Sequence, residues 1–313
     1  MCADLLGSDA SRPFSPCDAP FLAFETDSYR IFFKPAGMHS VSVASGDSGE
    51  NLLEWVRTGY PDQKSAYAAL SPVGSASPDS SVANPDTVLF RARRELGMLS
   101  RLDRETSGLV AFARKPKIFF QVLEEQARGR TRKRYWLFAT QTLHEEGLEG
   151  SMPPCLFRDR GDPFYEGREF SVESYFRSYG PKAQRVACLA PQPGLKMVQR
   201  RRQVKKLSQV LYQSDFRPLA KTIEGNEKWP SVPGCLAWEA SIRAGFRHQI
   251  RAHMAWCGHP IAGDRLYGLP KMTGVAGPEN EARLYLECHR LELPSPGGGT
   301  EIFELADGEI AER

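Results

Sequence analysis

Strand-like and helix-like segments follow one another along this 313-residue chain without the regular alternation of strand and helix that parallel βαβ units require. Residues 21–43 predict strand, turn and strand, and the apolar run 109–112 predicts a buried strand. Residues 116–127 and 248–257 carry apolar side chains at helical spacing. We therefore predict an α+β fold with a mainly antiparallel sheet.

Other segments fill in this prediction. Asn51 is a helix-capping residue and predicts a short helix through Arg57. Residues 61–86 are rich in Ser, Ala and Pro and are expected to form a loop or a mobile insertion. Further strands are predicted at 135–138, 236–242, 284–293 and 302–305.

The domain organisation follows from where these patterns begin and fade. Residues 1–20 have no periodicity and are expected to form a flexible tail. Residues 21–313 are expected to form a single domain, in which residues 141–233 are a poorly patterned, insertion-like region.

The composition is that of an ordinary soluble protein, with 41% hydrophobic and 25% charged residues. No apolar run approaches the roughly 20 residues that span a bilayer, and the first residues lack the pattern of a secretory signal. We expect a cytoplasmic protein without membrane contact. The seven cysteines contain no C-x-x-C pair, so reduced thiols are expected and no metal site is predicted.

Positive charge is concentrated in two segments, although the net charge is only +3. One cluster lies at residues 128–134 and the other at residues 196–206. Two such clusters on a nearly neutral chain are typical of a phosphate-binding face. A solvated, charged loop is the alternative interpretation of each cluster.

A carboxylate between two arginines is the first candidate for chemistry. Asp103 lies between Arg101 and Arg104, in a turn-forming segment that leads into the predicted strand at 109–112. If the segment is extended, Leu102 packs inward while Arg101 and Asp103 share the other face. An ionised, rigidly held aspartate is what a nucleophile or general base requires. The alternative is a turn aspartate paired with surface arginines.

Two further segments carry candidate residues. Arg251 lies at the border of the apolar seam of the helix at 248–257, where an arginine either reaches inward to an acid or extends to solvent. Tyr135 follows the first basic cluster, where a tyrosine either stacks on a base or belongs to the core. His248 and His253 are five residues apart, which is not the spacing of a helical metal pair.

The order of these motifs is similar to that of the RluA family of RNA pseudouridine synthases. The strings that carry the resemblance are Lys34-Pro35-Ala36-Gly37, Arg101-Leu102-Asp103-Arg104-Glu105-Thr106-Ser107-Gly108-Leu109, Lys133-Arg134-Tyr135, His248-Gln249-Ile250-Arg251-Ala252-His253, and Gly258-His259-Pro260-Ile261-Ala262-Gly263-Asp264 followed by Tyr267-Gly268. The resemblance covers residues 29–139 and 236–293.

The resemblance implies a pseudouridine synthase fold, with a bent mixed sheet and flanking helices and loops around a catalytic cleft. It implies that Asp103 is the catalytic residue, that Tyr135 packs against the target base, and that Arg251 pairs with the catalytic carboxylate. It also implies that Arg101 is linked to insertion behind the flipped nucleotide, and Ile250 is assigned with these residues to substrate binding.

The expected reaction isomerises uridine to pseudouridine in ribosomal or transfer RNA. A uridine inside a helix must first be extruded, which costs a few kcal/mol. The rearrangement neither oxidises nor hydrolyses the substrate overall, so no cofactor and no metal are expected. RNA is the expected partner, and a monomer is the expected state.

The chain departs from the family pattern at Ser100, where His is common, and at Phe246-Arg247, where Arg-Thr is common. We expect no separate RNA-binding domain before about residue 30, and therefore expect the two basic clusters to contribute to substrate selection. A catalytically silent RNA-binding protein on the same scaffold is the main alternative. A hydrolase of N-glycosidic bonds is a second alternative, for which only Glu105 is close enough in sequence to act as the second acid.

Overall fold

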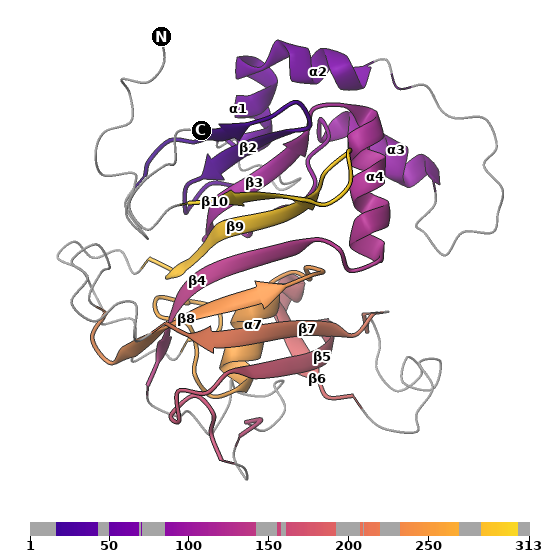
Figure 1. Ribbon diagram of the computed structural model, residues 1–313. Helices are drawn as coiled ribbons and strands as arrows, with labels where there is room; N and C mark the ends of the chain where they lie inside the picture. Colours follow the sequence, from indigo (N-terminus) through magenta and orange to yellow (C-terminus); the bar gives the residue numbers. More distant parts are fainter. Residues whose placement is uncertain are drawn as a thin grey trace. The chain divides into compact units, whose positions relative to one another are not determined.

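The structure, a computed structural model, describes residues 17–42, 50–68, 70, 85–141, 155–157, 161–191, 207–208, 210–219, 232–268 and 283–305 (Figure 1). The chain divides into two compact units. The N-terminal unit contains the described residues of 17–131 and 290–305, and the central unit contains those of 132–289. The prediction of a single domain over 21–313 remains a prediction.

The N-terminal unit contains the strands β1 (Phe21–Glu25), β2 (Tyr29–Lys34), β3 (Ser107–Ala113), the last part of β9 (Leu286–Pro294) and β10 (Thr300–Glu304), which neighbour one another in that order. β1 and β2, β2 and β3, and β9 and β10 pair antiparallel. The unit also contains α1 (Leu52–Gly59), α2 (Pro61–Ala68), α3 (Pro85–Arg94) and α4 (Pro116–Ala127).

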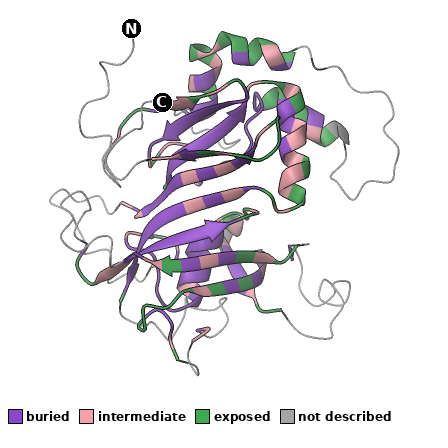
Figure 2. Ribbon diagram, in the orientation of Figure 1, coloured by how far each residue is buried: buried purple, intermediate pink, exposed green. Residues whose placement is uncertain are grey.

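Buried aromatic residues form much of the core of this unit. β2 and β3 are buried along their whole length (Figure 2). The ring of Phe32 on β2 meets those of Trp55 and Phe112 edge to face, at centroid distances of 5.8 and 5.4 Å. Such pairs stabilise the packing beyond the area that they bury.

The central unit is built around an antiparallel sheet in the order β4 (Arg132–Thr140), β8 (Cys235–Ile242), β7 (Tyr212–Pro218), β5 (Phe170–Tyr179), β6 (Arg185–Leu189), and the first residues of β9 lie beside β4. β5 and β7 alternate buried and more exposed residues, as expected for strands with one face against a core (Figure 2). The helix α7 (Gln249–Trp256) follows β8.

The predicted α+β class and most predicted elements are confirmed. The side chain of Asn51 accepts a hydrogen bond from the backbone of Glu54 at 3.1 Å and caps α1 as expected. Gly258 follows α7 with a φ of 90°, which is the left-handed conformation that ends many helices. None of the helices formed by the described residues is long and apolar enough to cross a membrane.

The prediction of a loop throughout residues 61–86 is wrong at both ends of that range. Residues 61–68 form α2, and α3 begins at Pro85. Pro61 occupies the first turn of α2, where its missing N–H costs nothing. Gln63 and Tyr67 are buried one turn apart, so tertiary contacts hold a segment whose sequence has little amphipathic pattern. Residues 71–84 lie outside the described residues.

Candidate active site

The Asp103 segment is fastened to the loop that follows β2. The hydroxyl of Ser40 donates to the carbonyl of Leu102 at 2.8 Å and accepts from its amide at 3.0 Å. The amide of Gly37 donates to the carbonyl of Arg104 at 2.8 Å, and the Arg104 side chain donates back to the Gly37 carbonyl at 2.9 Å. Asp103 lies between these two fastened residues and is half-buried. The predicted inward packing of Leu102 is confirmed.

A buried lysine lies beneath this junction. The Lys34 ammonium donates to the carbonyls of Pro35 and Met38 at 2.8 Å and to that of Arg104 at 3.2 Å. Burial lowers the pKa of Lys34 to about 7, although the negative charges of Asp103 and Glu105 act to raise it. The first two motifs of the sequence therefore meet around one ammonium group.

Arg101 is attached to a buried carboxylate. Its guanidinium forms an ion pair with Glu95, whose side chain is 6% exposed, and Arg91 binds the other carboxylate oxygen at 3.2 Å. Arg101 itself is half exposed. The sequence did not predict Glu95, because nothing in its local pattern separates it from the other charged residues that end α3.

Helix α2 supports the turn that positions Glu95. After Glu95, Leu96 and Gly97 both adopt left-handed backbone conformations, with φ of 52° and 77°. The Gln63 amide donates to the carbonyls of Leu96 at 2.8 Å and Ala113 at 2.7 Å. A Cβ at Gly97 would lie 2.2 Å from the Tyr67 hydroxyl, so only glycine fits there.

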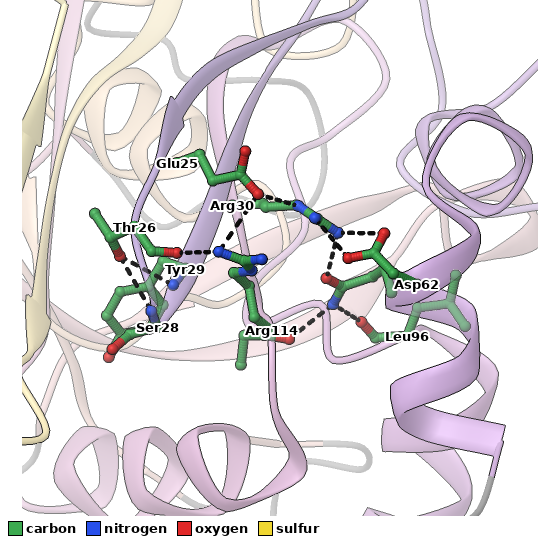
Figure 3. Close-up of polar contacts among 10 residues, drawn as sticks. Glu25, Thr26, Ser28, Tyr29, Arg30, Asp62, Leu96 and Arg114 are labelled. Carbon is green, nitrogen blue, oxygen red and sulfur yellow. Dashed lines mark hydrogen bonds and ion pairs between the residues drawn. The ribbon is translucent and has the colours of Figure 1, made fainter.

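An arginine of β2 holds α2 in turn. Arg30 donates to both carboxylate oxygens of Asp62 on α2, at 3.0 and 2.6 Å, and to Glu25 at 2.8 Å (Figure 3). Arg114 lies 3.5 Å from the same Glu25 carboxylate. Ion pairing with Arg30 lowers the pKa of Asp62. Contacts thus run from β2 through α2 to the Glu95–Arg101 pair.

In the central unit, Tyr135 and α7 lie on the same side of the sheet. Tyr135 of β4 is opposite Ala240 of β8, which is opposite Phe216 of β7. Directly paired residues point to the same face, as do alternate residues of one strand, so Ser214 shares this face. The His253 ring of α7 contacts the Ser214 hydroxyl at 2.9 Å, which places α7 on that face.

Arg251 forms a buried ion pair within the central unit. Its Nε and Nη2 donate to the two carboxylate oxygens of Asp264, each at 2.7 Å. Oδ1 of Asp264 also accepts from the amides of Leu266 and Tyr267, at 2.8 and 3.0 Å. The Arg251 guanidinium lies 5.5 Å from the centroid of the Tyr267 ring. Asp264 belongs to the Gly258–Asp264 string, which is the sequence signal for this partner.

Helix α7 is held from its other side by polar side chains. His253 lies between the hydroxyls of Ser174 and Ser214, each 2.9 Å from a ring nitrogen. Burial lowers the pKa of His253 to about 3, so the ring is neutral at physiological pH. The Gln249 amide donates to the Gln213 carbonyl at 2.8 Å. Ile250 is buried beside these contacts.

The first basic cluster is partly neutralised. Arg128 and Arg130 both form ion pairs with Glu125. Arg134 contacts the buried Glu239 at 3.1 Å. Burial alone would raise the pKa of Glu239, but contact with His289, whose Nε2 lies 3.3 Å from its carboxylate, and the charges of Arg217 and Arg134 lower it to about 2. The second cluster, at 196–206, lies outside the described residues.

The structure thus assigns the predicted site residues to two groups. Asp103 and Arg101 share one loop of the N-terminal unit, whereas Tyr135, Ile250 and Arg251 lie in the central unit. The pairing of Arg251 with Asp103 remains a prediction. Within the described part of the chain, no group of three or more His, Cys, Asp or Glu residues is arranged to hold a metal ion.

Comparisons with known proteins agree with the motifs. A family model described as RNA pseudouridylate synthase matches residues 28–256, which is more than half of the chain. The tRNA pseudouridine synthase C of Vibrio parahaemolyticus is 26% identical over 212 residues, covering 66% of this chain and 70% of that protein. The dual-specificity RNA pseudouridine synthase RluA of Escherichia coli is 35% identical over 66 residues, covering 21% of this chain and 28% of that protein.

A solved structure supports the fold. The human RNA Pseudouridylate Synthase Domain Containing 1 aligns with a TM-score of 0.51 at 12% identity, covering 91% of this chain and 82% of that chain. The family match and the motifs lead to one conclusion: the chain belongs to the RNA pseudouridylate synthase family and is an RNA pseudouridine synthase of the RluA type.

Proposed function

We propose that Asp103 is the catalytic carboxylate with which this enzyme converts uridine to pseudouridine in transfer or ribosomal RNA. The observation that carries the proposal is the fastening of the Asp103 segment on both sides. Ser40 binds Leu102 before it, and Gly37 binds Arg104 after it, which limits the movement of the carboxylate between them. A reacting group held in this manner loses little entropy on reaching the transition state.

The reaction rearranges bonds within the uridine nucleotide. The bond between ribose C1′ and ring N1 breaks, a bond between C1′ and ring C5 forms, the hydrogen on C5 leaves, and N1 gains a proton. Three alternative roles in this reaction are open to the Asp103 carboxylate: attack on the sugar, attack on the base, or abstraction of a sugar proton. Each role requires an ionised carboxylate next to the flipped nucleotide.

The other site residues then act on the substrate. Tyr135 would pack against the base, Arg251 would pair with the Asp103 carboxylate, and Arg101 would occupy the space that the nucleotide leaves. Ile250 would line the site beside Arg251. Extrusion of the nucleotide costs a few kcal/mol, which these contacts would offset.

The RNA substrate is the open choice within this proposal. The Vibrio relative is named for transfer RNA, and a Neisseria relative is named for the large ribosomal subunit. Both RNAs therefore belong in the experiment. We also propose that the enzyme acts as a monomer in the cytoplasm.

The test is to incubate purified enzyme with unmodified transfer and ribosomal RNA transcripts and to map pseudouridine by carbodiimide adducts and primer extension. The proposal predicts new sites with the wild-type enzyme and none with Asp103→Asn. If neither protein forms pseudouridine on any transcript while both still bind RNA, the result would instead favour a catalytically silent RNA-binding protein. The proposed monomeric state is tested by measuring the molar mass of the purified enzyme by light scattering.

A further inference from the structure

The turn between β5 and β6 is hydrogen-bonded to the segment that precedes α7. The Arg247 guanidinium donates to the carbonyl of Ala183 at 2.5 Å and to that of Arg185 at 3.3 Å. Both acceptors belong to the turn at residues 180–185. A turn that is distant in sequence from α7 is therefore held beside its first residues.

The residue before Arg247 reinforces this attachment. The Phe246 ring stacks on that of Phe176 in β5, with centroids 4.9 Å apart and planes at 5°. It also meets the ring of Tyr212 in β7 at 5.2 Å. Phe246 and Arg247 are the positions at which the sequence departs from the Arg-Thr pattern of the family. In this chain, both residues hold the β5–β6 hairpin.

The turn has a strained backbone that presents a cation. Lys182 and Ala183 have φ of 51° and 55°, an unusual conformation for two successive residues other than glycine. Such conformations cost of order 1–3 kcal/mol each and persist only where the surroundings impose them. The Lys182 side chain is exposed.

Within the described part of the chain, the contacts that fix this turn pair none of its cations with a carboxylate. The partners of Arg247 are backbone carbonyls, and the charge of Arg185 acts on the phenol of Tyr179. The cluster at 128–134 differs, because Arg128 and Arg130 share the carboxylate of Glu125. The positive charge of the turn is therefore available to an anionic partner, whereas the charges of Arg128 and Arg130 are already paired.

One tyrosine connects the turn to the candidate active site. The Tyr267 hydroxyl accepts a hydrogen bond from the amide of Val186 in β6 at 2.8 Å and lies 3.1 Å from Nδ1 of His248. The ring of the same tyrosine lies 5.5 Å from the Arg251 guanidinium. The hairpin and Arg251 therefore share a rigid neighbour.

We propose that the turn at residues 180–185, together with Arg247, is a contact for the phosphate backbone of the RNA substrate beside Arg251. The inference rests on the proposed function and adds a binding surface to it. Lys182 and Arg185 supply cations, and Arg247 fixes the turn that carries them. Charge complementarity with RNA is the reason for choosing this partner.

The test compares wild type with Lys182→Glu and Lys182→Asn. It measures their affinity, at several salt concentrations, for the unmodified form of the RNA in which the enzyme forms pseudouridine. Asparagine tolerates the left-handed backbone, so that variant removes the charge while keeping the turn. Lys64→Glu is the matched control, since Lys64 is an exposed lysine on α2 in the N-terminal unit. The proposal predicts that Lys182→Asn weakens binding by roughly threefold. It also predicts that the fall of the log association constant with log salt concentration becomes less steep by about 0.7–1.

Charge reversal in Lys182→Glu should weaken binding further, and Lys64→Glu should leave both affinity and slope unchanged. Equal affinity and slope in wild type and both Lys182 variants would overturn the inference, even with pseudouridine formation intact. A wild-type enzyme that forms no pseudouridine on any transcript would overturn the proposed function instead. The two failures are thus separate.

Discussion

Arg251 and Asp264 form a bidentate ion pair in the interior of the central unit, with two contacts of 2.7 Å and side chains that are 3% and 0% exposed. The same carboxylate accepts two backbone amides from the turn at Leu266 and Tyr267. The arginine that the motif assigns to the active site is therefore oriented by a carboxylate of its own unit. Paired, hydrogen-bonded charges of this kind are tolerated in an interior, whereas a single one is costly.

Asp264→Asn is expected to lower the free energy of unfolding by about 3–5 kcal/mol, because it removes the carboxylate charge that the buried Nε and Nη2 of Arg251 contact. Urea unfolding measures this loss. Glu124→Gln is the matched control, since it breaks an exposed pair with Arg128 and should change stability by less than about 0.5 kcal/mol. A similar, small effect of both variants would contradict the assigned role of Asp264.

The buried Lys34 is expected to make the free energy of unfolding depend on pH. Its pKa is lowered from 10.5 to about 7 by burial, so between these values the unfolded chain holds a proton that the native chain has released. The free energy of unfolding must rise with pH in this window. We expect the stability difference between wild type and Lys34→Met to grow in favour of wild type from pH 7 to pH 10.

Chemical denaturation at several pH values measures that difference. A difference that stays constant from pH 6 to pH 10 would show that Lys34 does not titrate there. Asp103→Asn provides a second readout, because the Asp103 charge acts to raise the pKa of Lys34. Its removal should move the start of the rise to lower pH.

The Glu95–Arg101 pair predicts an energetic coupling. If Glu95 positions Arg101 for the reaction, Glu95→Gln and Arg101→Met should each slow single-turnover pseudouridine formation by about tenfold. The double variant should be slowed little more than either single one, since the two changes remove the same interaction. Glu54→Gln, which breaks an exposed pair with Arg57, is the control. Fully multiplicative effects in the double variant would contradict the coupling.

The sequence predicted those parts of the fold that have local patterns. The apolar run at 109–112 and the Asn51 cap are local signals, and both predictions are confirmed by β3 and α1. Helix α2 was missed because its stability depends on partners far along the chain, such as Ala113 and Arg30. Residues 141–233 were poorly patterned, yet they supply β5, β6 and β7.

The same limit applies to the candidate site. Asp103 and Arg251 were predicted because they lie in long motifs. Asp264 lies within the Gly258–Asp264 motif, but its pairing with Arg251 is set by the three-dimensional structure. Glu95 carried no local signal, and the turn at Leu96 and Gly97 follows it in the structure that pairs it with Arg101. Side-chain partners that are brought together by turns are the part that sequence patterns do not specify.

The role of Asp103 as the catalytic carboxylate is tested by the single-turnover release of tritium from RNA labelled at C5 of uridine. Release reports the loss of the C5 hydrogen, which accompanies formation of the new bond. The enzyme is compared with Asp103→Asn and with Glu105→Gln, which makes the same chemical change at an exposed carboxylate two residues away.

Asp103→Asn is expected to slow release by about 1,000-fold or more, while its RNA affinity stays within about twofold of wild type. Glu105→Gln should release tritium at nearly the wild-type rate. Release by Asp103→Asn at a rate close to that of wild type would contradict the assignment of Asp103 as the catalytic carboxylate.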